Sequence, residues 1–394
     1  MFDEFKINSV GWCKVRFGDV VRNVDVTVRN PLEQGLERFV GLEHLEPESL
    51  QIKRWGNVAD GTSFTRKFER GQILFGKRRA YQRKAAVADF GGICSGDILV
   101  FEPKTDELLP ALLPFIVQSD GFFEHALGTS AGSLSPRTKW SDLARYEFSL
   151  PPKDEQQQIA EILWGADKTT LEYGKIIANL QILKQATIDE FIERNSDKWQ
   201  FVEFSQITEN GTLNGLYKPK TDYGDGIEVI HMGDLFANEI ITNGGLQRIK
   251  LTDAEIKSHG LKTGDLIFAR RSVVFEGAGQ CSIIGNLNEP MSFESSLIRV
   301  SLNQEQAIPF FYFYWFQSES GKRVMSSITR RGSIAGIAAS DLYRIKIPLP
   351  NVDEQKKLIE KVEAVKNSEK ETKLAFEKAE TLKVSLVSHL LTNK

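Results

Sequence analysis

The chain has 394 residues, of which 41% are hydrophobic and 26% charged, and its formal net charge is −3. This length predicts about two to four domains, and the composition is typical of a globular protein. The longest apolar run, residues 308–316, is too short to cross a bilayer. MFDEFKINSV does not resemble a secretory signal, and Cys13, Cys94 and Cys281 have no paired spacing, so we expect a reducing, cytoplasmic location without disulfides or a zinc site.

The first segment, residues 1–150, is rich in predicted strands. The run Ile98-Leu-Val-Phe and the stretch between Gly71 and Gly76 are bounded by residues that favour turns, which predicts two strands. Residues 112–127 are predicted to form a helix with aromatic side chains on its buried face. We expect residues 1–150 to form one domain.

Positive charge is concentrated in one stretch of this segment, SFTRKFERGQILFGKRRAYQRK at residues 63–84. Between Arg66 and Lys84 there are eight Lys or Arg and one Glu, whereas residues 1–150 have 20 residues of each sign. Basic side chains in a loop can neutralise phosphates, and arginine can bond to O6 and N7 of guanine. The alternative is a solvated charged surface. We predict DNA contacts from Arg66, Lys67, Arg70, Lys77, Arg78, Arg79, Tyr81, Arg83 and Lys84.

The chain then repeats itself. LPPKDEQQQIAEIL at residues 150–163 recurs as LPNVDEQKKLIEKV at 349–362, and Asp142-Leu143 recurs as Asp341-Leu342. The chain therefore consists of two similar halves, each a strand-rich segment followed by a long helix. We expect boundaries at 1–150, 151–195, 196–350 and 351–394, with pseudo-twofold symmetry between the halves.

Both predicted helices, residues 154–194 and 353–393, carry apolar residues at alternating spacings of three and four, which is typical of a coiled coil. Each would be about 60 Å long, more than the diameter of a 150-residue domain. We therefore predict that they pair antiparallel rather than each packing only on its own domain. Asp154 and Asp353 are the predicted N-caps, and Lys394 should lie near the start of the first helix. The predicted seam consists of Ile159, Leu163, Ala166, Tyr173, Ile177, Leu180, Phe191, Leu358, Val362, Val365, Phe376, Ala379, Leu386 and Leu390.

The second strand-rich segment contains the predicted strands Ile227-Glu-Val-Ile and Leu297-Ile-Arg-Val and a predicted helix over residues 310–328. The aromatic run 310–316 could stack on bases, but aromatic residues on every side of a helix favour a core. Basic residues recur near the positions equivalent to those of the first half. We predict DNA contacts from Arg270, Arg271, Lys322, Arg323, Arg330 and Arg331, with surface salt bridges as the alternative.

Motifs for catalysis are not found. The chain has no G-x-x-x-x-G-K-[ST], G-x-S-x-G or H-E-x-x-H, and its five histidines have no metal-ligand spacing. The Asn/Asp-Pro-Pro-aromatic motif of amino-methyltransferases is also missing, since Asn30-Pro31-Leu32 lacks the second proline and the aromatic residue. We predict no catalytic residues and no metal site in this chain.

The repeated motifs resemble one known family. The stretches GQILFGKRRAYQRK, GGICSGDILVFEP and SAGSLSPRTKWSDLARYEFSLPPKDEQQQIAEIL, with GDLIFARR and GSIAGIAASDLYRIKIPLPNVDEQKKLIEKV in the second half, are similar to the specificity subunit of type I restriction–modification systems. The resemblance covers essentially the whole chain. It implies an α/β (α+β) fold with two mixed strand/helix target recognition domains, separated by two long helices that form an antiparallel coiled coil.

The resemblance also implies a function. A member of this family reads a bipartite site on double-stranded DNA, one recognition domain for each half-site, and is not itself an enzyme. Its helices bind modification (methyltransferase) subunits, expected to be two, and the complex includes restriction (motor and nuclease) subunits and no membrane. S-adenosylmethionine, ATP and Mg would then be bound by the partner subunits and no cofactor by this chain. Two alternatives stay open: a subunit serving a fused methyltransferase–nuclease of another restriction type, and a coiled-coil scaffold that does not bind DNA.

Overall fold

The computed structural model describes residues 11–391 and contains both strands and helices. The chain divides into two compact units, of which unit 1 comprises Met1–Gly174 with Leu374–Lys394 and unit 2 comprises Lys175–Lys373. Two long helices, α5 (Lys153–Asn195) and α11 (Val352–Leu391), contribute residues to both units. Among residues 11–391, no helix is both long and apolar enough to cross a bilayer. The predicted mixture of strands with two long helices is confirmed.

Within its described residues, 11–174 and 374–391, unit 1 contains ten short strands and four short α-helices besides its parts of the two long helices. The strands are β1 (Cys13–Arg16), β2 (Val21–Asn23), β3 (Arg38–Val40), β4 (Gly56–Asn57), β5 (Arg66–Phe68), β6 (Ile73–Gly76), β7 (Ala85–Val87), β8 (Gly92–Cys94), β9 (Ile98–Pro103) and β10 (Glu147–Leu150). The α-helices are α1 (Phe17–Val20), α2 (Leu113–Gln118), α3 (Asp120–Gly128) and α4 (Trp140–Leu143), and the 3-10 turns are η1 (Leu32–Gln34), η2 (Val58–Asp60) and η3 (Ala80–Gln82). One sheet has the order β2-β9-β6-β7, another has the order β4-β3-β8-β5, and β1 pairs with β10.

Unit 2 has the same kinds of element in nearly the same order. Its strands are β11 (Gln200–Glu203), β12 (Thr208–Asn214), β13 (Tyr223–Ile230), β14 (Ile240–Ile241), β15 (Arg248–Ile249), β16 (Leu266–Ala269), β17 (Arg271–Ser272), β18 (Cys281–Ile284), β19 (Met291–Phe293), β20 (Leu297–Leu302), β21 (Ala335–Gly336) and β22 (Lys346–Leu349). Its α-helices are α6 (Met232–Ala237), α7 (Asp253–His259), α8 (Pro309–Gln317), α9 (Glu319–Ile328) and α10 (Ala339–Arg344), and its 3-10 turns are η4 (Ser196–Lys198), η5 (Phe204–Ile207), η6 (Lys220–Asp222) and η7 (Phe275–Gly277). The sheets have the orders β12-β20-β16-β18-β14 and β15-β13-β19, and β11 pairs with β22 and β17 with β21.

The two units repeat the same strand pairing. In unit 1, β6 lies between β9 and β7, and in unit 2, β16 lies between β20 and β18. The strand before each long helix pairs antiparallel with the first strand of its unit, β10 with β1 and β22 with β11. Trp12 and Trp199 immediately precede β1 and β11. The repeat in the sequence is therefore a repeat in the fold.

One buried glutamine explains why the Asp-Glu-Gln motif occurs twice. The Gln156 side chain is 1% exposed, accepts a hydrogen bond from Leu109 N (2.8 Å), and donates to the carbonyl oxygens of Glu107 (2.7 Å) and Pro151 (2.8 Å). It ties the first turn of α5 to the loop that precedes α2. A primary amide offers one acceptor oxygen and two donor hydrogens, and all three are used, two by this loop and one by Pro151 just before α5.

Gln355 makes the same contacts 199 residues later. It is fully buried, accepts from Ile308 N (2.7 Å), and donates to the carbonyl oxygens of Gln306 (2.8 Å) and Pro350 (3.0 Å). Each of its partners is also 199 residues beyond the corresponding partner of Gln156. The glutamine of each motif therefore joins the start of a long helix to its own unit.

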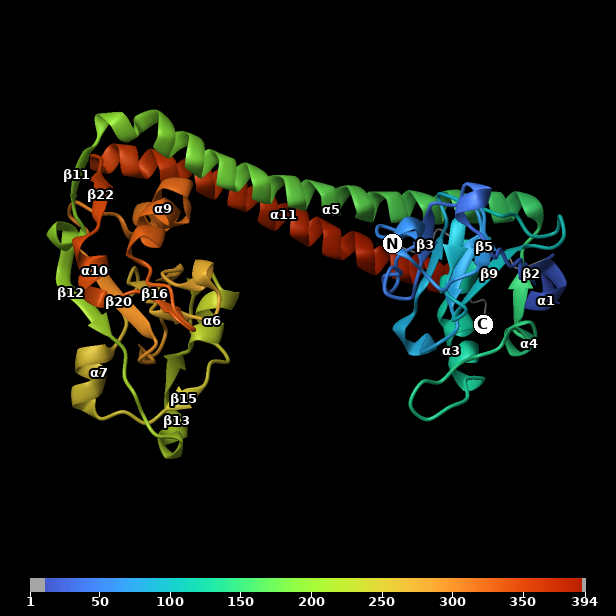
Figure 1. Ribbon diagram of the computed structural model, residues 1–394, viewed down its shortest axis with the longest axis horizontal. Coiled ribbons are helices and arrows are strands. Elements are labelled where there is room, and N and C mark those ends of the chain that lie inside the picture. The colour runs from blue at the N-terminus through green and yellow to red at the C-terminus, as the bar shows by residue number, and fades with distance from the viewer. Residues whose placement is uncertain (1–10, 392–394) are drawn as a thin grey trace. The chain divides into compact units, whose positions relative to one another are not determined.

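The long helices pair within each unit. In unit 1, Leu390 near the end of α11 packs in one hydrophobic cluster with Ile159 and Leu163 near the start of α5. In unit 2, Leu358 near the start of α11 packs with Ile188 near the end of α5. Within each unit the paired segments consequently run antiparallel (Figure 1). None of the predicted seam residues is exposed. The prediction for Lys394 lies outside the described residues.

Polar pairs interrupt this apolar seam. In unit 1 the Lys383 ammonium lies 2.6 Å from the Asp167 carboxylate, and both side chains are largely buried. In unit 2 the Gln181 amide donates to the Glu369 carboxylate at 3.2 Å. A buried polar pair such as Lys383 with Asp167 fixes which turns of two helices face each other, whereas the Gln181–Glu369 pair is exposed.

Two predictions about helix ends are wrong. α11 begins at Val352, and its cap is Asn351, whose side chain accepts from Glu354 N at 2.9 Å. Since α5 begins at Lys153, Asp154 and Asp353 lie inside the first turns, where their charge complements the helix dipole.

The two predicted aromatic helices are each broken in the middle. Ser119 separates α2 from α3, and Ser318 separates α8 from α9, and both serines have extended backbone dihedral angles. Each hydroxyl accepts a hydrogen bond from the amide three residues on, so a new helix starts there. The aromatic run is core, as predicted, because residues 311–316 are buried.

Candidate nucleic-acid interface

Four of the predicted basic residues of unit 2 line one cleft. Arg270 and Arg271 lie at the end of β16 and the start of β17, while Arg330 and Arg331 lie in the loop that follows α9. Antiparallel pairing of Arg271 with Gly336 joins these two segments. The cleft has a volume of about 560 Å³ and is also lined by Asn214 and Ser340. The predicted residues are thus brought together although 60 positions separate them in the sequence.

The positive charge of this cleft is only partly neutralised. Arg330 lies 2.7 Å from the Asp341 carboxylate, and the Arg270 guanidinium donates to the carbonyl oxygen of Ser295 at 3.2 Å. The Arg331 guanidinium lies 4.8 Å from the centre of the Phe275 ring, an arrangement that holds the cation without cancelling its charge. Among residues 11–391, no carboxylate is paired with Arg271 or Arg331, and both residues are exposed. Such a cleft can bind an anion such as a phosphate.

Unit 1 has an equivalent loop pair with different side chains. Thr138 N donates to Lys77 O just as Ile337 N donates to Arg270 O, so Lys77 and Arg78 occupy the places of Arg270 and Arg271. The bridge between Ala131 and Arg137 corresponds to that between Arg330 and Gly336. Arg137 therefore adds a cation that the sequence reasoning missed, because its counterpart is a glycine.

An acid lies inside the basic cluster of unit 1. The Asp97 carboxylate accepts from Arg137 at 2.8 and 3.1 Å and lies 3.5 Å from Arg78. The hydrogen bond from Arg137 holds the pKa of Asp97 below its ordinary value. Burial, with the nearby charge of Arg66, lowers the pKa of Lys77. The corresponding residue of unit 2 is Ser296, so the two units present clusters of different net charge.

The other basic residues of the 63–84 stretch are mostly held by the fold. Arg66 pairs with Asp25 (2.9 Å) and donates to Ile98 O, Lys67 pairs with Glu69 (2.9 Å), and Lys84 donates to Leu42 O (2.7 Å). Arg83 lies between Glu48 (3.0 Å) and Asp120 (2.9 Å) and stacks over Phe123. These groups have structural partners, whereas Arg70 and Tyr81 are exposed.

Arg79 has unusual backbone geometry. Its φ of 54° places it in the left-handed region, and Arg83, on the other side of η3, has a φ of 50°. Non-glycine residues in this region cost about 1–2 kcal/mol. Arg79 N donates to Pro136 O at 2.8 Å, which ties this loop to the one that carries Arg137.

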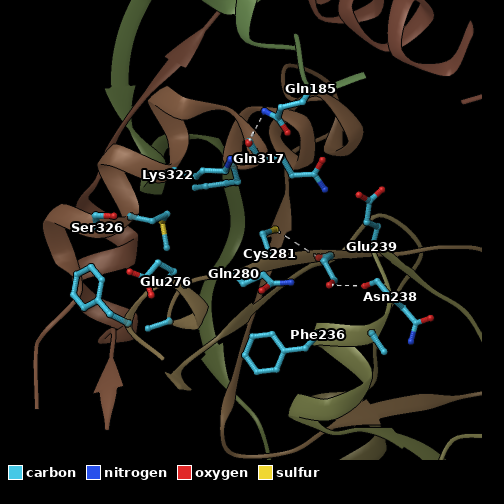
Figure 2. Close-up of a pocket in the computed structure, with 17 residues that line it drawn as sticks. Gln185, Phe236, Asn238, Glu239, Glu276, Gln280, Cys281, Gln317, Lys322 and Ser326 are labelled. Atoms are coloured by element: carbon cyan, nitrogen blue, oxygen red, sulfur yellow. Dashed lines mark hydrogen bonds between the residues drawn. The ribbon is translucent and has the colours of Figure 1, made fainter. Parts of the chain in front are cut away.

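Lys322 and Arg323 do not join the arginine cleft. They lie in the first turn and a half of α9, where Lys322 pairs with Glu319 (3.1 Å) and Arg323 donates to Ser320. Lys322 instead borders a separate pocket of about 600 Å³ with Gln185, Glu239 and Cys281 (Figure 2). Phe275 lines this second pocket, and its ring also contacts the Arg331 guanidinium of the cleft.

Comparison with known proteins assigns the chain to a family. The model of the type I restriction modification DNA specificity domain matches residues 56–181 and 196–377. The chain belongs to this family. Its role is therefore in DNA sequence specificity, and the resemblance seen in the sequence is confirmed.

Members of the type I specificity family and their solved structures give the range of similarity. The chain is 24% identical over 302 residues to the EcoKI specificity subunit of Escherichia coli K12. This alignment covers 73% of this chain and 64% of that protein. A solved chain from a study of complex assembly and conformational transition of the type I R-M system aligns with a TM-score of 0.66 at 15% identity, covering 96% of this chain and 97% of that one. The HsdS subunit of Thermoanaerobacter tengcongensis aligns with a TM-score of 0.51 at 16% identity, covering 99% of each chain. These structures show the shared fold.

Within residues 11–391, no cluster of three His, Cys, Asp or Glu side chains is arranged to hold a metal ion. Cys94 and Cys281 are buried, and burial raises the pKa of both thiols, which keeps them protonated.

Proposed function

We propose that the chain is a non-catalytic DNA-recognition subunit in which each unit reads one half of a bipartite site. The observation that carries this proposal is the arginine cleft of unit 2, with its equivalent around Lys77, Arg78 and Arg137 in unit 1. The same backbone scaffold presents basic side chains in both units, but the side chains differ. Different side chains on one scaffold are what two readers of different half-sites require.

The roles within each cluster follow from their partners. Arg271 and Arg331 have no paired carboxylate among the described residues, so binding a phosphate or a base does not require breaking an ion pair. Arg137 is held from one side by Asp97, which fixes its guanidinium in one orientation. A pre-oriented guanidinium suits recognition of guanine O6 and N7.

The long helices are proposed to bind two methyltransferase subunits and to fix the separation of the half-sites. Leu183 of α5 in unit 2 and Leu382 of α11 in unit 1 are 50% and 44% exposed, and they lie 199 residues apart at equivalent positions. Exposed apolar side chains at equivalent positions would suit two copies of one partner. Those partners would carry S-adenosylmethionine, because chemistry on a base requires a catalytic pocket beside each reader. ATP and Mg would be bound by the restriction subunits.

The test is DNA binding by the chain assembled with its methyltransferase subunits. The double substitution Arg271→Ala and Arg331→Ala should weaken binding and lower the slope of log affinity against log salt by up to about 1.8, since each lost phosphate contact contributes about 0.9. Lys257→Ala is the control, because Lys257 is an exposed cation of the same unit, lies outside the cleft and is not among the predicted DNA contacts, so it should leave both quantities unchanged. Unchanged affinity and slope in the double variant would instead favour a scaffold that does not use this cleft for DNA.

A further inference from the structure

In each unit, the loop that closes the basic cluster carries an exposed aliphatic side chain near its tip. Leu134 is 91% exposed and Ile334 is 57% exposed. Single exposed aliphatic residues are common on protein surfaces. These two, however, follow the same Gly-Ser pair in equivalent loops, at the third of five tip positions in unit 1 and at the fourth in unit 2, although the residues that follow differ, GSLSPR in one and GSIAGI in the other.

The backbone of both loops is built alike. Ala131 and Arg137 exchange two backbone hydrogen bonds of 3.0 Å, and Arg330 and Gly336 exchange bonds of 2.9 and 3.2 Å. Five residues remain at each tip, and the loop after α3 projects from its unit (Figure 1). In unit 1 the Ser135 hydroxyl accepts from Arg78 (2.6 Å), so the residue after Leu134 is fixed to the basic cluster.

Both aliphatic side chains lie close to arginine side chains. Ile334 lines the same cleft as the four arginines of unit 2. Leu134 lies between Ala131 and Arg137, whose guanidinium is half exposed. A partner for this surface must offer anionic groups and, next to them, an apolar surface. Double-stranded DNA offers this combination, with phosphates outside and the faces of stacked bases inside.

We infer that Leu134 and Ile334 act as wedges that enter the base stack, one in each half-site. This inference rests on the proposed function. The arginines neutralise the phosphates on either side, and the aliphatic side chain partly separates two neighbouring bases. Leu and Ile are among the side chains that proteins insert between base steps, and the cost of unstacking is offset by closer contact with the bent duplex. A wedge contributes to sequence choice through the ease of unstacking a step, without a hydrogen bond to a base.

The experiment uses the chain assembled with its methyltransferase subunits and a duplex that carries its recognition site, determined beforehand by mapping methylated adenines. 2-Aminopurine, whose emission rises when it is unstacked, is placed in one half-site at a time at a step that does not include the methylated adenine. Leu134→Ala and Ile334→Ala are compared with Leu32→Ala, an exposed leucine of unit 1 in η1. All three substitutions are at exposed positions, where the effect on stability is small.

Leu134→Ala is expected to abolish the 2-aminopurine signal in one half-site only, and Ile334→Ala in the other only. Affinity for the specific duplex should fall about tenfold, comparable with one mismatched base pair. The salt slope should stay unchanged because no phosphate contact is lost. Leu32→Ala should match the unsubstituted chain.

Three results would overturn the inference. Unchanged emission with affinity within about twofold would show that the tips are ordinary surface. Weaker binding with unchanged emission would place the side chain on a base edge, such as a thymine methyl, and not in the stack. A single variant that removes both signals would mean that the tips do not act in separate half-sites. Failure of the proposed function is distinguishable, because the unsubstituted complex would then bind the mapped duplex no better than an unrelated one.

Discussion

The buried glutamines at the starts of the long helices should contribute far more to the free energy of unfolding than the exposed glutamine or lysine next to them. Gln156→Ala removes three hydrogen bonds and leaves Leu109 N, Pro151 O and Glu107 O without their partner. A buried polar group left unsatisfied costs about 1–3 kcal/mol. Because Glu107 is exposed, water can reach its carbonyl oxygen, so we count two groups and expect a loss of about 3 kcal/mol in the free energy of unfolding of unit 1.

The assay is calorimetry with urea titration of the intact chain, and the control lies one residue away. For a unit of this size, about 3 kcal/mol corresponds to a fall in Tm of about 6–12 °C. Gln157 is exposed and bonds only to Glu161 on the same helix, so Gln157→Ala should change stability by at most about 0.5 kcal/mol. Gln156→Glu keeps the side-chain volume but replaces a donor by an acceptor facing two carbonyl oxygens, and should destabilise unit 1 as much as alanine does.

Equal stabilities for Gln156→Ala and Gln157→Ala would refute this reasoning. A loss from Gln156→Ala with none from Gln156→Glu would show that packing, and not hydrogen bonding, makes the joint. Gln355→Ala should act on unit 2 in the same way, because its contacts are the same.

Other expectations follow from single contacts. Because the pKa of Asp97 is lowered in the folded state, its ion pair stabilises the fold at pH values above the ordinary pKa of about 4. This stability is lost as the pH falls through the lowered pKa. The destabilisation by Asp97→Asn, measured by urea midpoints, should therefore be present at neutral pH and shrink in acid. Lys383→Met leaves Asp167 largely buried without its cation and should cost about 2 kcal/mol, and the double variant Lys383→Met with Asp167→Leu should recover most of that loss in a double-mutant cycle. Inserting four residues after Tyr173 and four after Lys373 should lengthen the helix pair by about 6 Å and shift the preferred half-site separation by about one to two base pairs, as read by methylation mapping.

Much of the fold follows from sequence pattern. Repeated motifs and seams at spacings of three and four identify both ends of the first long helix and the start of the second to within one residue, because a helix of this length depends on local periodicity. The predicted end of the second helix lies outside the described residues. The breaks at Ser119 and Ser318 were missed, although a serine followed by an acidic residue is a helix-start signal. The polar stretches 118–121 and 317–320, which contain these serines, mark both breaks in the sequence.

The candidate interface was less predictable, for a physical reason. Arg66 and Arg83 looked like surface cations, but their carboxylate partners Asp25, Glu48 and Asp120 are distant in sequence and are brought close only by folding. Arg137 could have been found by asking which residues flank the loop equivalent to residues 330–336. Local charge density thus identifies the region, and long-range pairing decides which cations remain available.

The central claim is that each unit reads one half-site independently, and a domain exchange tests it most directly. Residues 13–150 would be replaced by the matching segment of another specificity subunit with a known site, keeping both long helices, in cells that lack the parental system. Methylated adenines would then be mapped across the genome. The account predicts that one half-site changes to that of the donor, while the other half-site and the spacing stay the same. A change in both half-sites, or a site without two separated parts, would contradict it.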